Sequence, residues 1–279
     1  MCIRDSYLIV TDYNSPDKLI HLFDKNTFEH LASSTYQGQG PDEITIIGHV
    51  GIDETNRRFF VSDHGKLKIF AYDLDSVLTT PEYQPSVKID MKKKLFPDDY
   101  LYLNDTLCIA KIIEPIGNND YKPSVARWNM ATEEINPMPY EYPDLKKVRF
   151  IYAASAEHQL YVQCYTQYDL MTICDFNGNL KCNIYGPKWV NEKTQTQHYS
   201  LGVEFCGDKI LALYSGGDHR TDAYYPTKFL VFDLNGNYLK TLETGYMITD
   251  FCYDKENNRL IINLNDEIQF AYLDLEGII

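Results

Sequence analysis

The stretch Arg58-Phe-Phe-Val-Ser-Asp63-His-Gly-Lys66-Leu-Lys-Ile-Phe-Ala-Tyr-Asp73 decides the fold. It contains two short runs rich in aromatic and β-branched residues, each run ends in Asp, and the turn residues His64-Gly65 separate them. Short runs of this composition, bounded by turn residues, are typical of paired antiparallel strands. We therefore predict a β-hairpin at this point of the chain.

The same pattern recurs along the whole chain. The second run of each copy ends in Asp or Asn, and these closing residues are Asp24, Asp73, Asn129, Asp175, Asp233 and Asp274. Their intervals of 49, 56, 46, 58 and 41 residues match the period of a β-propeller, in which each blade buries both of its faces only by stacking on its neighbours. We predict an all-β, six-bladed β-propeller that forms a single domain over residues 1–279. A β-sandwich and two unrelated β domains are the alternatives.

Local signals support this prediction. Asn177-Gly178 and Asn235-Gly236 predict hairpins with type I′ turns, in which both central residues have positive φ. Convincing helical periodicity is lacking over any 12 residues, so we expect few helices. The residues expected to be buried between blades are Leu8, Val10, Phe60, Val61, Ile69, Val162, Ile173, Leu213, Val231, Ile261 and Phe270.

Composition excludes several classes of protein. Lys plus Arg is 26 and Asp plus Glu is 40, which gives a net charge of −14 and argues against a protein that binds nucleic acid phosphates. Uninterrupted apolar runs fall short of the 18 residues that a transmembrane helix needs. The seven Cys residues contain no CxxC pair, and we expect most to be reduced thiols in the core. A disulfide between Cys174 and Cys182, which flank one hairpin turn, is left open.

The amino terminus lacks the apolar region of a secretory signal, although Tyr7–Asp12 already resembles a strand. We predict that Met1–Ser6 is a non-native scar and that native sequence upstream of it has been lost. A lipoprotein interpretation of Cys2 is weak, because an apolar region before it is missing.

Two further stretches resemble a known family. Gln37-Gly-Gln-Gly-Pro-Asp-Glu43 is similar to the Gly-x-Gly-Pro-x-Glu sequence that enters the second blade of TolB-like six-bladed β-propellers, which are widespread in Bacteroidetes, and Tyr185-Gly-Pro-Lys-Trp189 resembles a second copy. The resemblance covers nearly the whole chain. It implies the propeller fold and an exported or lipid-anchored protein of the cell envelope, but no particular activity. Both ends depart from the family pattern, so we expect the first and last blades to have fewer strands than the others.

The propeller topology predicts where a binding site would lie. Connections between blades, and those between the second and third strands of a blade, emerge on one face. The longest of these is Ser215–Thr227, and long connections are often functional. We predict a ligand-binding site centred on His219 and Arg220, and its residues are Asp218, His219, Arg220, Asp222 and Tyr224. The alternative is a solvated insertion in which the Asp residues cap turns.

A second group of residues lies in the segments expected to form innermost strands. His49, Glu204 and Asp250 fall there, and carboxylates that converge on a central channel could hold calcium. The alternative is that these residues only contact water in the channel. We otherwise expect no cofactor. The sequence contains no Gly-x-Ser-x-Gly elbow, no P-loop and no His-Glu-x-x-His motif.

Two functional hypotheses follow. The first is a non-catalytic recognition propeller, a monomer that binds a protein, peptide or glycan. The second is a metal-assisted hydrolase or lyase with its site at the mouth of the channel. The absence of a catalytic motif favours the first. The negative charge disfavours anionic ligands except beside local cations such as Arg220 and Lys188, so a neutral glycan or a basic peptide fits best.

Overall fold

The computed structural model describes residues 1–91, 95–117, 120–143, 145 and 147–279, and the backbone alone at Arg4 and Asp222. The chain divides into two compact units, of which the first comprises Met1–Pro115 with Val125–Asn136 and the second comprises Ile116–Ser124 with Pro137–Ile279. Six antiparallel sheets follow one another in chain order, of which the first two and most of the third lie in the first unit and the last three in the second. The fold is a six-bladed β-propeller, as predicted. That it forms a single domain stays a prediction.

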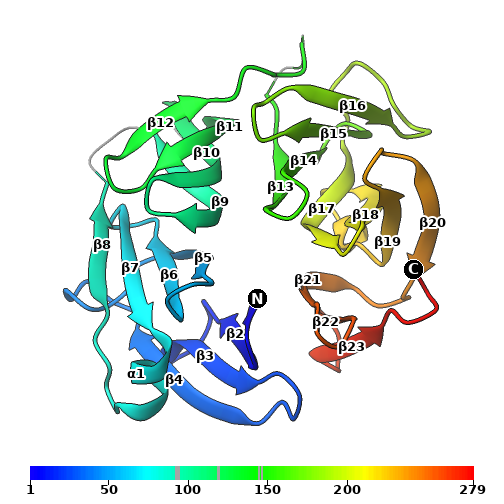
Figure 1. The fold of residues 1–279 in the computed structure, drawn as a ribbon. Coiled ribbons are helices and arrows are strands. Elements are labelled where there is room, and N and C mark those ends of the chain that lie inside the picture. Colours follow the sequence, from blue (N-terminus) through cyan, green and yellow to red (C-terminus); the bar gives the residue numbers. More distant parts are fainter. Residues whose placement is uncertain (92–94, 118–119, 144, 146) are drawn as a thin grey trace. The chain divides into compact units, whose positions relative to one another are not determined.

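The first unit contains two four-stranded sheets and most of a third (Figure 1). The first sheet consists of β1 (Cys2–Arg4), β2 (Tyr7–Thr11), β3 (Lys18–Asp24) and β4 (His30–Tyr36). The second consists of β5 (Ile47–Asp53), β6 (Arg58–Asp63), β7 (Lys68–Asp73) and β8 (Ser86–Asp90). The third consists of β9 (Phe96–Asn104), β10 (Leu107–Gly117), β11 (Asp120–Asn129) and β12 (Glu134–Pro137).

The second unit contains two four-stranded sheets and one three-stranded sheet. The fourth sheet consists of β13 (Phe150–Ser155), β14 (Leu160–Tyr165), β15 (Leu170–Asp175) and β16 (Leu180–Tyr185). The fifth consists of β17 (Thr196–Cys206), β18 (Lys209–Asp218), β19 (Lys228–Asp233) and β20 (Tyr238–Glu243). The sixth consists of β21 (Ile248–Asp254), β22 (Arg259–Leu264) and β23 (Phe270–Asp274).

Helices are scarce, as expected. The described part of the chain contains α1 (Leu74–Thr79) and the 3₁₀ turn η1 (Asp222–Tyr224). Neither is long and apolar enough to cross a membrane.

The central strands β6 and β18 each supply side chains to two hydrophobic cores. In β6, Phe59 and Val61 pack towards the first sheet, whereas Phe60 packs towards the third. In β18, Leu211 packs towards the sixth sheet and Ile210 towards the fourth. Successive side chains of a strand point to opposite faces, so a strand that is apolar throughout must be covered on both sides. This requirement explains why the sheets stack on one another.

The first strands of neighbouring sheets contact each other within each unit. Contacts join β5 to β9 in the first unit, and β17 to both β13 and β21 in the second. The segments predicted to be innermost, Ile44–Ile52, Ser200–Cys206 and Met247–Tyr253, overlap β5, β17 and β21.

The predicted core is correct at ten of its eleven positions, all of which are at most 8% exposed. Phe270 is the exception, at 41% exposed. It lies on β23, the outer strand of the sixth sheet, and the described residues contain no fourth strand that would cover it. The alternation of apolar and polar residues correctly predicts that Phe270 lies on a strand. It does not indicate which face of that strand packs against a neighbouring sheet.

The Asn-Gly hairpins form, but not with the predicted turn. Gly178 and Gly236 have φ of 79° and 84°, whereas the Asn residues before them do not share the positive φ that a type I′ turn needs. In the second hairpin Gly236 N–H donates to Asp233 O, and the Asp233 carboxylate accepts from the N–H groups of Asn235 and Asn237. The carboxylate thus stabilises a longer loop in which only Gly requires the left-handed conformation.

The seven Cys residues are free thiols. Cys174 pairs in register with Leu180, and a register shift separates this pair from Ile173 and Cys182. The structure therefore contains no disulfide between Cys174 and Cys182, and five of the seven thiols are buried, as expected.

The terminal sheets differ from the prediction at one end. The sixth sheet has three strands, as expected, but the first has four. Its strand β1 lies inside the segment interpreted as a scar, where Cys2 pairs with Ile9 and Ile3 with Leu8. The prediction of an incomplete first blade is wrong because these residues pair with β2 across a tight turn at Asp5.

Asp63, at the end of β6, holds the segment that enters the second sheet. Its fully buried carboxylate accepts from the backbone N–H groups of Thr45 and Ile46 at 2.8 and 3.1 Å, and from those of Gly65 and Lys66 at 2.9 and 3.1 Å. One carboxylate therefore satisfies four backbone donors from two loops. Asp63 therefore links the loop before β5 to the turn after β6.

We expect Asp63→Ala to lower the free energy of unfolding by about 2–4 kcal/mol, because it leaves buried N–H groups without an acceptor. Urea denaturation followed by circular dichroism measures this change. Asp24→Ala is the matched control, because Asp24 accepts only from Asn26 and Thr27 in its own turn and should cost less. Equal losses from the two variants would contradict the linking role of Asp63.

Candidate functional site

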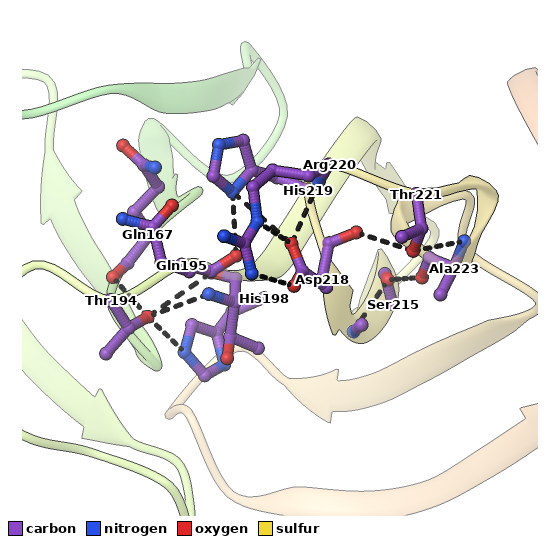
Figure 2. Close-up of polar contacts among 12 residues, drawn as sticks. Gln167, Thr194, Gln195, His198, Ser215, Asp218, His219, Arg220, Thr221 and Ala223 are labelled. Carbon is purple, nitrogen blue, oxygen red and sulfur yellow. Dashed lines mark hydrogen bonds and ion pairs between the residues drawn. The ribbon is translucent and has the colours of Figure 1, made fainter.

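The predicted binding insertion is shorter and more ordered than the sequence indicated. Strand β18 continues through Ser215 to Asp218 and pairs Gly217 with Gln197 and Asp218 with Thr196. The irregular part therefore starts at His219. Ser215 Oγ donates to the carbonyl of Ala223 at 2.7 Å, which folds the insertion back over the end of its own strand (Figure 2).

Most of the predicted polar ligands already have partners inside the insertion. Arg220 donates from Nε and Nη2 to the two carboxylate oxygens of Asp218, at 2.9 and 2.5 Å. The hydrogen bonds and charge of Arg220 hold the pKa of Asp218 well below its ordinary value. His219 donates from Nδ1 to the carbonyl of Gln195 at 2.8 Å (Figure 2). The two guanidinium nitrogens that could bind a ligand carboxylate in a bidentate manner are therefore already bound to Asp218.

The two remaining predicted residues differ in what the structure describes. Tyr224 stacks on Tyr225, with ring centroids 4.2 Å apart and an interplanar angle of 29°. The side chain of Asp222 lies outside the described residues. The structure therefore brings Asp218, His219 and Arg220 together, places an aromatic pair beside them, and leaves their predicted ligand-binding role as a prediction.

A buried polar cluster lies next to the insertion. Asp169, which is 1% exposed, accepts from the Tyr214 hydroxyl at 3.2 Å and from the Lys188 backbone N–H at 2.9 Å. His198 Nδ1 lies 3.2 Å from the same hydroxyl, and its Nε2 lies 3.5 Å from Thr194 Oγ1. Burial lowers the pKa of His198, and the Asp169 carboxylate partly opposes this shift. His198 Nδ1 lies 3.7 Å from the Asp169 carboxylate, and both side chains are 1% exposed, so the pair lies in the interior of the second unit.

The two Gly-Pro motifs have a structural role. In the first, Glu43 accepts from the Gly40 N–H at 2.7 Å, and a Cβ on Gly38 would lie 2.0 Å from Glu43 Oε2. In the second, a Cβ on Gly186 would lie 2.2 Å from the carboxyl carbon of Asp169. Each Gly therefore leaves room for a carboxylate to pack against the backbone of a loop between blades.

Aromatic rings gather around the second motif. The aromatic cluster comprises Tyr142, Tyr168, Tyr185 and Trp189, with ring centroids 5.0–6.4 Å apart. Tyr168 is buried beneath it, whereas Tyr185 is 50% exposed. The sequence singled out Tyr185 and Trp189 only as part of the motif. It could not indicate that Tyr142, more than 40 positions away in the chain, would join them.

Lys188 connects the aromatic cluster to the insertion. Its backbone is held by Asp169, and its Nζ donates to the carbonyl of Gly216 in β18 at 3.5 Å. The second Gly-Pro loop and the insertion therefore lie on the same face of the second unit, as predicted. An exposed ring surface, a cation and the Asp218–Arg220 pair adjoin one another there.

The residues proposed for calcium do not form a complete site. Burial, and then the nearby Asp250 carboxylate, raise the pKa of Glu204 to about 8, so Glu204 is protonated at neutral pH. Its Oε2 is buried without a hydrogen-bond partner. His49, in the first unit, is held by Asp99 at 2.9 Å and by the carbonyl of Tyr100. Within the described ranges, no group of three or more His, Cys, Asp or Glu side chains could hold a metal ion.

Comparison with known proteins supports the fold. A family model described as "DUF5128: 6-bladed beta-propeller" matches residues 1–106. A member of the DUF4221 family from Bacteroides vulgatus is similar in structure, with a TM-score of 0.62 and 12% identity over 98% of this chain and 93% of that chain. No match was found among curated proteins.

Two other solved structures share the fold at low identity. The extracellular domain of BT4673 from B. thetaiotaomicron, described as a one component system, matches 96% of this chain and 34% of that chain, with a TM-score of 0.58 and 11% identity. The RRP9 WD40 repeats match 96% of this chain and 73% of that chain, with a TM-score of 0.58 and 10% identity. The comparisons thus support a six-bladed propeller similar to Bacteroides proteins. The TolB-like relationship and the exported or lipid-anchored state stay predictions.

The buried His198 predicts how stability depends on pH. Its lowered pKa means that the unfolded chain binds this proton more tightly than the folded chain does, so stability falls as the pH drops below the unfolded value of about 6.5. The unfolding free energy stops falling once the pH is below the pKa of His198 in the folded protein, because His198 is then protonated in both states. We expect His198→Gln to remove part of the decline in unfolding free energy between about pH 7 and 5, measured by urea denaturation at each pH.

The control for this prediction is Gln37→Ala, which changes an exposed side chain that does not titrate. It should leave the decline unchanged. A decline as steep in His198→Gln as in the unsubstituted protein would show that His198 does not carry the effect.

Proposed function

We propose that this protein is a non-catalytic recognition propeller of the cell envelope that binds a neutral glycan or a basic peptide. The binding surface is the aromatic cluster together with Lys188 and the insertion from Asp218 to Tyr225. The observation that carries the proposal is the exposed aromatic surface beside a β18 insertion whose acid and base groups are already paired with one another.

Ring faces of Tyr and Trp bind ligands through apolar contact while their polar atoms donate hydrogen bonds. Trp189 contacts the rings of Tyr142 and Tyr185, and the hydroxyls of these two tyrosines lie 3.3 Å apart. Such a surface suits the apolar face of a sugar ring or an aliphatic side chain. Because the chain has a net charge of −14, a neutral or basic ligand approaches more readily than an anion.

The packing of the cluster favours a preformed surface. Tyr168 supports Trp189 from below, and the loop that carries Trp189 is fixed by hydrogen bonds from the Gly186 and Lys188 N–H groups to Asp169. A surface held in this way loses little conformational freedom when a ligand binds. The same Asp169 carboxylate also accepts from Tyr214 on β18, which ties the cluster to the strand that carries the insertion.

A screen of the purified protein against a glycan array and a library of Lys- and Arg-containing peptides tests the proposal. We expect Trp189→Ala to weaken any binding by about tenfold or more, because truncating a central aromatic residue typically costs at least about 1.4 kcal/mol. Tyr13→Ala is the matched control, since Tyr13 is 72% exposed and lies in the first unit. His219→Ala with Arg220→Ala tests the insertion separately.

Binding that survives Trp189→Ala but is lost in Tyr13→Ala would place the site elsewhere. Release of hydrolysis or elimination products from a bound glycan or peptide would contradict the non-catalytic role.

The calcium alternative makes a different prediction. A cation at Glu204 must displace the proton that its raised pKa retains, so calcium affinity would rise with pH. On the recognition hypothesis we expect millimolar calcium or EDTA to leave the melting temperature unchanged at both pH 7 and pH 9. A calcium-dependent increase that Glu204→Gln abolishes would favour the metal-assisted alternative.

A further inference from the structure

Two histidine side chains meet at one serine hydroxyl on the first sheet. His21 lies on β3, and His30 and Ser33 lie on the adjacent strand β4 (Figure 1). His21 Nδ1 lies 2.8 Å from Ser33 Oγ, and His30 Nε2 lies 2.7 Å from the same oxygen. The centroids of the two imidazole rings are 6.2 Å apart. One nitrogen of each ring therefore points to a common position.

A β-bulge brings these side chains to one face of the sheet. Ser33 is opposite His21 and His30 is opposite Phe23, and the register between these pairs shifts past Leu31. Residues three apart on a regular strand point to opposite faces, so His30 and Ser33 could not meet without the shift. The extra residue of the bulge restores them to one face. The Phe23 ring packs edge-on against His30, with centroids 5.4 Å apart.

The same register shift occurs between the third and fourth strands of three other sheets, but different residues occupy the equivalent positions. The residues equivalent to His21, Ser33 and His30 are Lys68, Asp90 and Val87 in the second sheet, Thr172, Asn183 and Leu180 in the fourth, and Leu230, Thr241 and Tyr238 in the fifth. The fold therefore supplies the geometry, and among these four sheets only the first places two imidazoles in it.

Converging imidazole nitrogens are ligands for divalent transition-metal ions such as Zn²⁺, Ni²⁺ and Cu²⁺. These ions bind imidazole at about 2.0–2.1 Å, so rotation of the two rings must bring their nitrogens closer together in place of the hydroxyl. The charges of Asp12 and Asp17 favour a cation at His21. The pair is smaller than the groups of three or more metal-binding side chains that the described residues lack, so water must complete the coordination.

We propose that His21 and His30 bind a divalent transition-metal ion, with water as the remaining ligands. Ser33 positions the two rings in the absence of the metal. His30 is exposed and His21 is half-buried, so a metal ion can reach the pair from solution. The pair lies in the first unit, whereas the surface proposed for ligand recognition lies in the second, so each proposal can be tested without the other.

Isothermal titration calorimetry with Zn²⁺ tests the proposal. Cys2 and Cys182, the two partly exposed thiols, are first alkylated so that they cannot bind the metal. We expect Zn²⁺ to bind, and we expect His21→Ala and His30→Ala each to weaken binding by about tenfold or more, because one imidazole alone lacks the advantage of two linked ligands. The variant with both substitutions should bind little more weakly than either single variant. Ca²⁺, which prefers oxygen ligands, should not bind to this pair.

Ser33→Ala is the matched control. It removes both hydrogen bonds to the imidazoles but keeps the two ligands, so we expect it to retain Zn²⁺ binding. His158→Ala removes a histidine of the second unit that is hydrogen-bonded to the carbonyl of Gly207, and it should have no effect. Circular dichroism checks that each variant is folded.

Pulsed electron paramagnetic resonance of the Cu²⁺ complex counts the imidazole ligands. Two coordinated imidazoles in the unsubstituted protein and one in His21→Ala or His30→Ala would support the proposal. A single imidazole in the unsubstituted protein would overturn it, and so would absence of Zn²⁺ binding or a Zn²⁺ affinity that neither substitution lowers. Equal weakening by Ser33→Ala would also overturn it, since disturbance of the sheet would then account for the loss.

Discussion

The structure depends on strands whose two faces are both apolar. Phe59 and Phe60 are adjacent in β6 and fully buried, yet they pack into cores on opposite sides of one sheet. Burying such a side chain contributes about 1.5–3 kcal/mol to stability. Side chains on both faces of a sheet are buried only when another sheet covers each face. Stacking of successive sheets follows from this requirement. The six strand repeats then give six blades.

Carboxylates connect the stacked sheets through their loops. Asp63 binds four backbone N–H groups from two segments, and Asp169 joins a loop between blades to Tyr214 of the next sheet. These two buried carboxylates therefore hold loops of the fold together. Asp218 likewise accepts from the backbone N–H and the guanidinium of Arg220 in its own insertion.

The surface proposed for recognition is one that the fold leaves partly exposed. In the aromatic cluster, Tyr185 is exposed, Tyr142 and Trp189 are half-buried, and Tyr168 is buried. Trp189 and Tyr185 lie in or beside a loop between blades, and loops vary more readily than the strands that hold them.

The sequence by itself determined the repeat, the class of fold and nearly all of the predicted core, because strand alternation and turn residues are local signals. It also placed Ser215–Thr227 and the second Gly-Pro loop on one face. It could not determine that Arg220 pairs with Asp218, that Gly38 and Gly186 make room for carboxylates, or that Tyr142 joins Trp189. It misplaced Phe270, because alternation does not reveal which strand lies at an edge. The contacts of Gly186 with Asp169 and of Tyr142 with Trp189 join residues distant in the chain, and only the tertiary structure decides which of those residues meet.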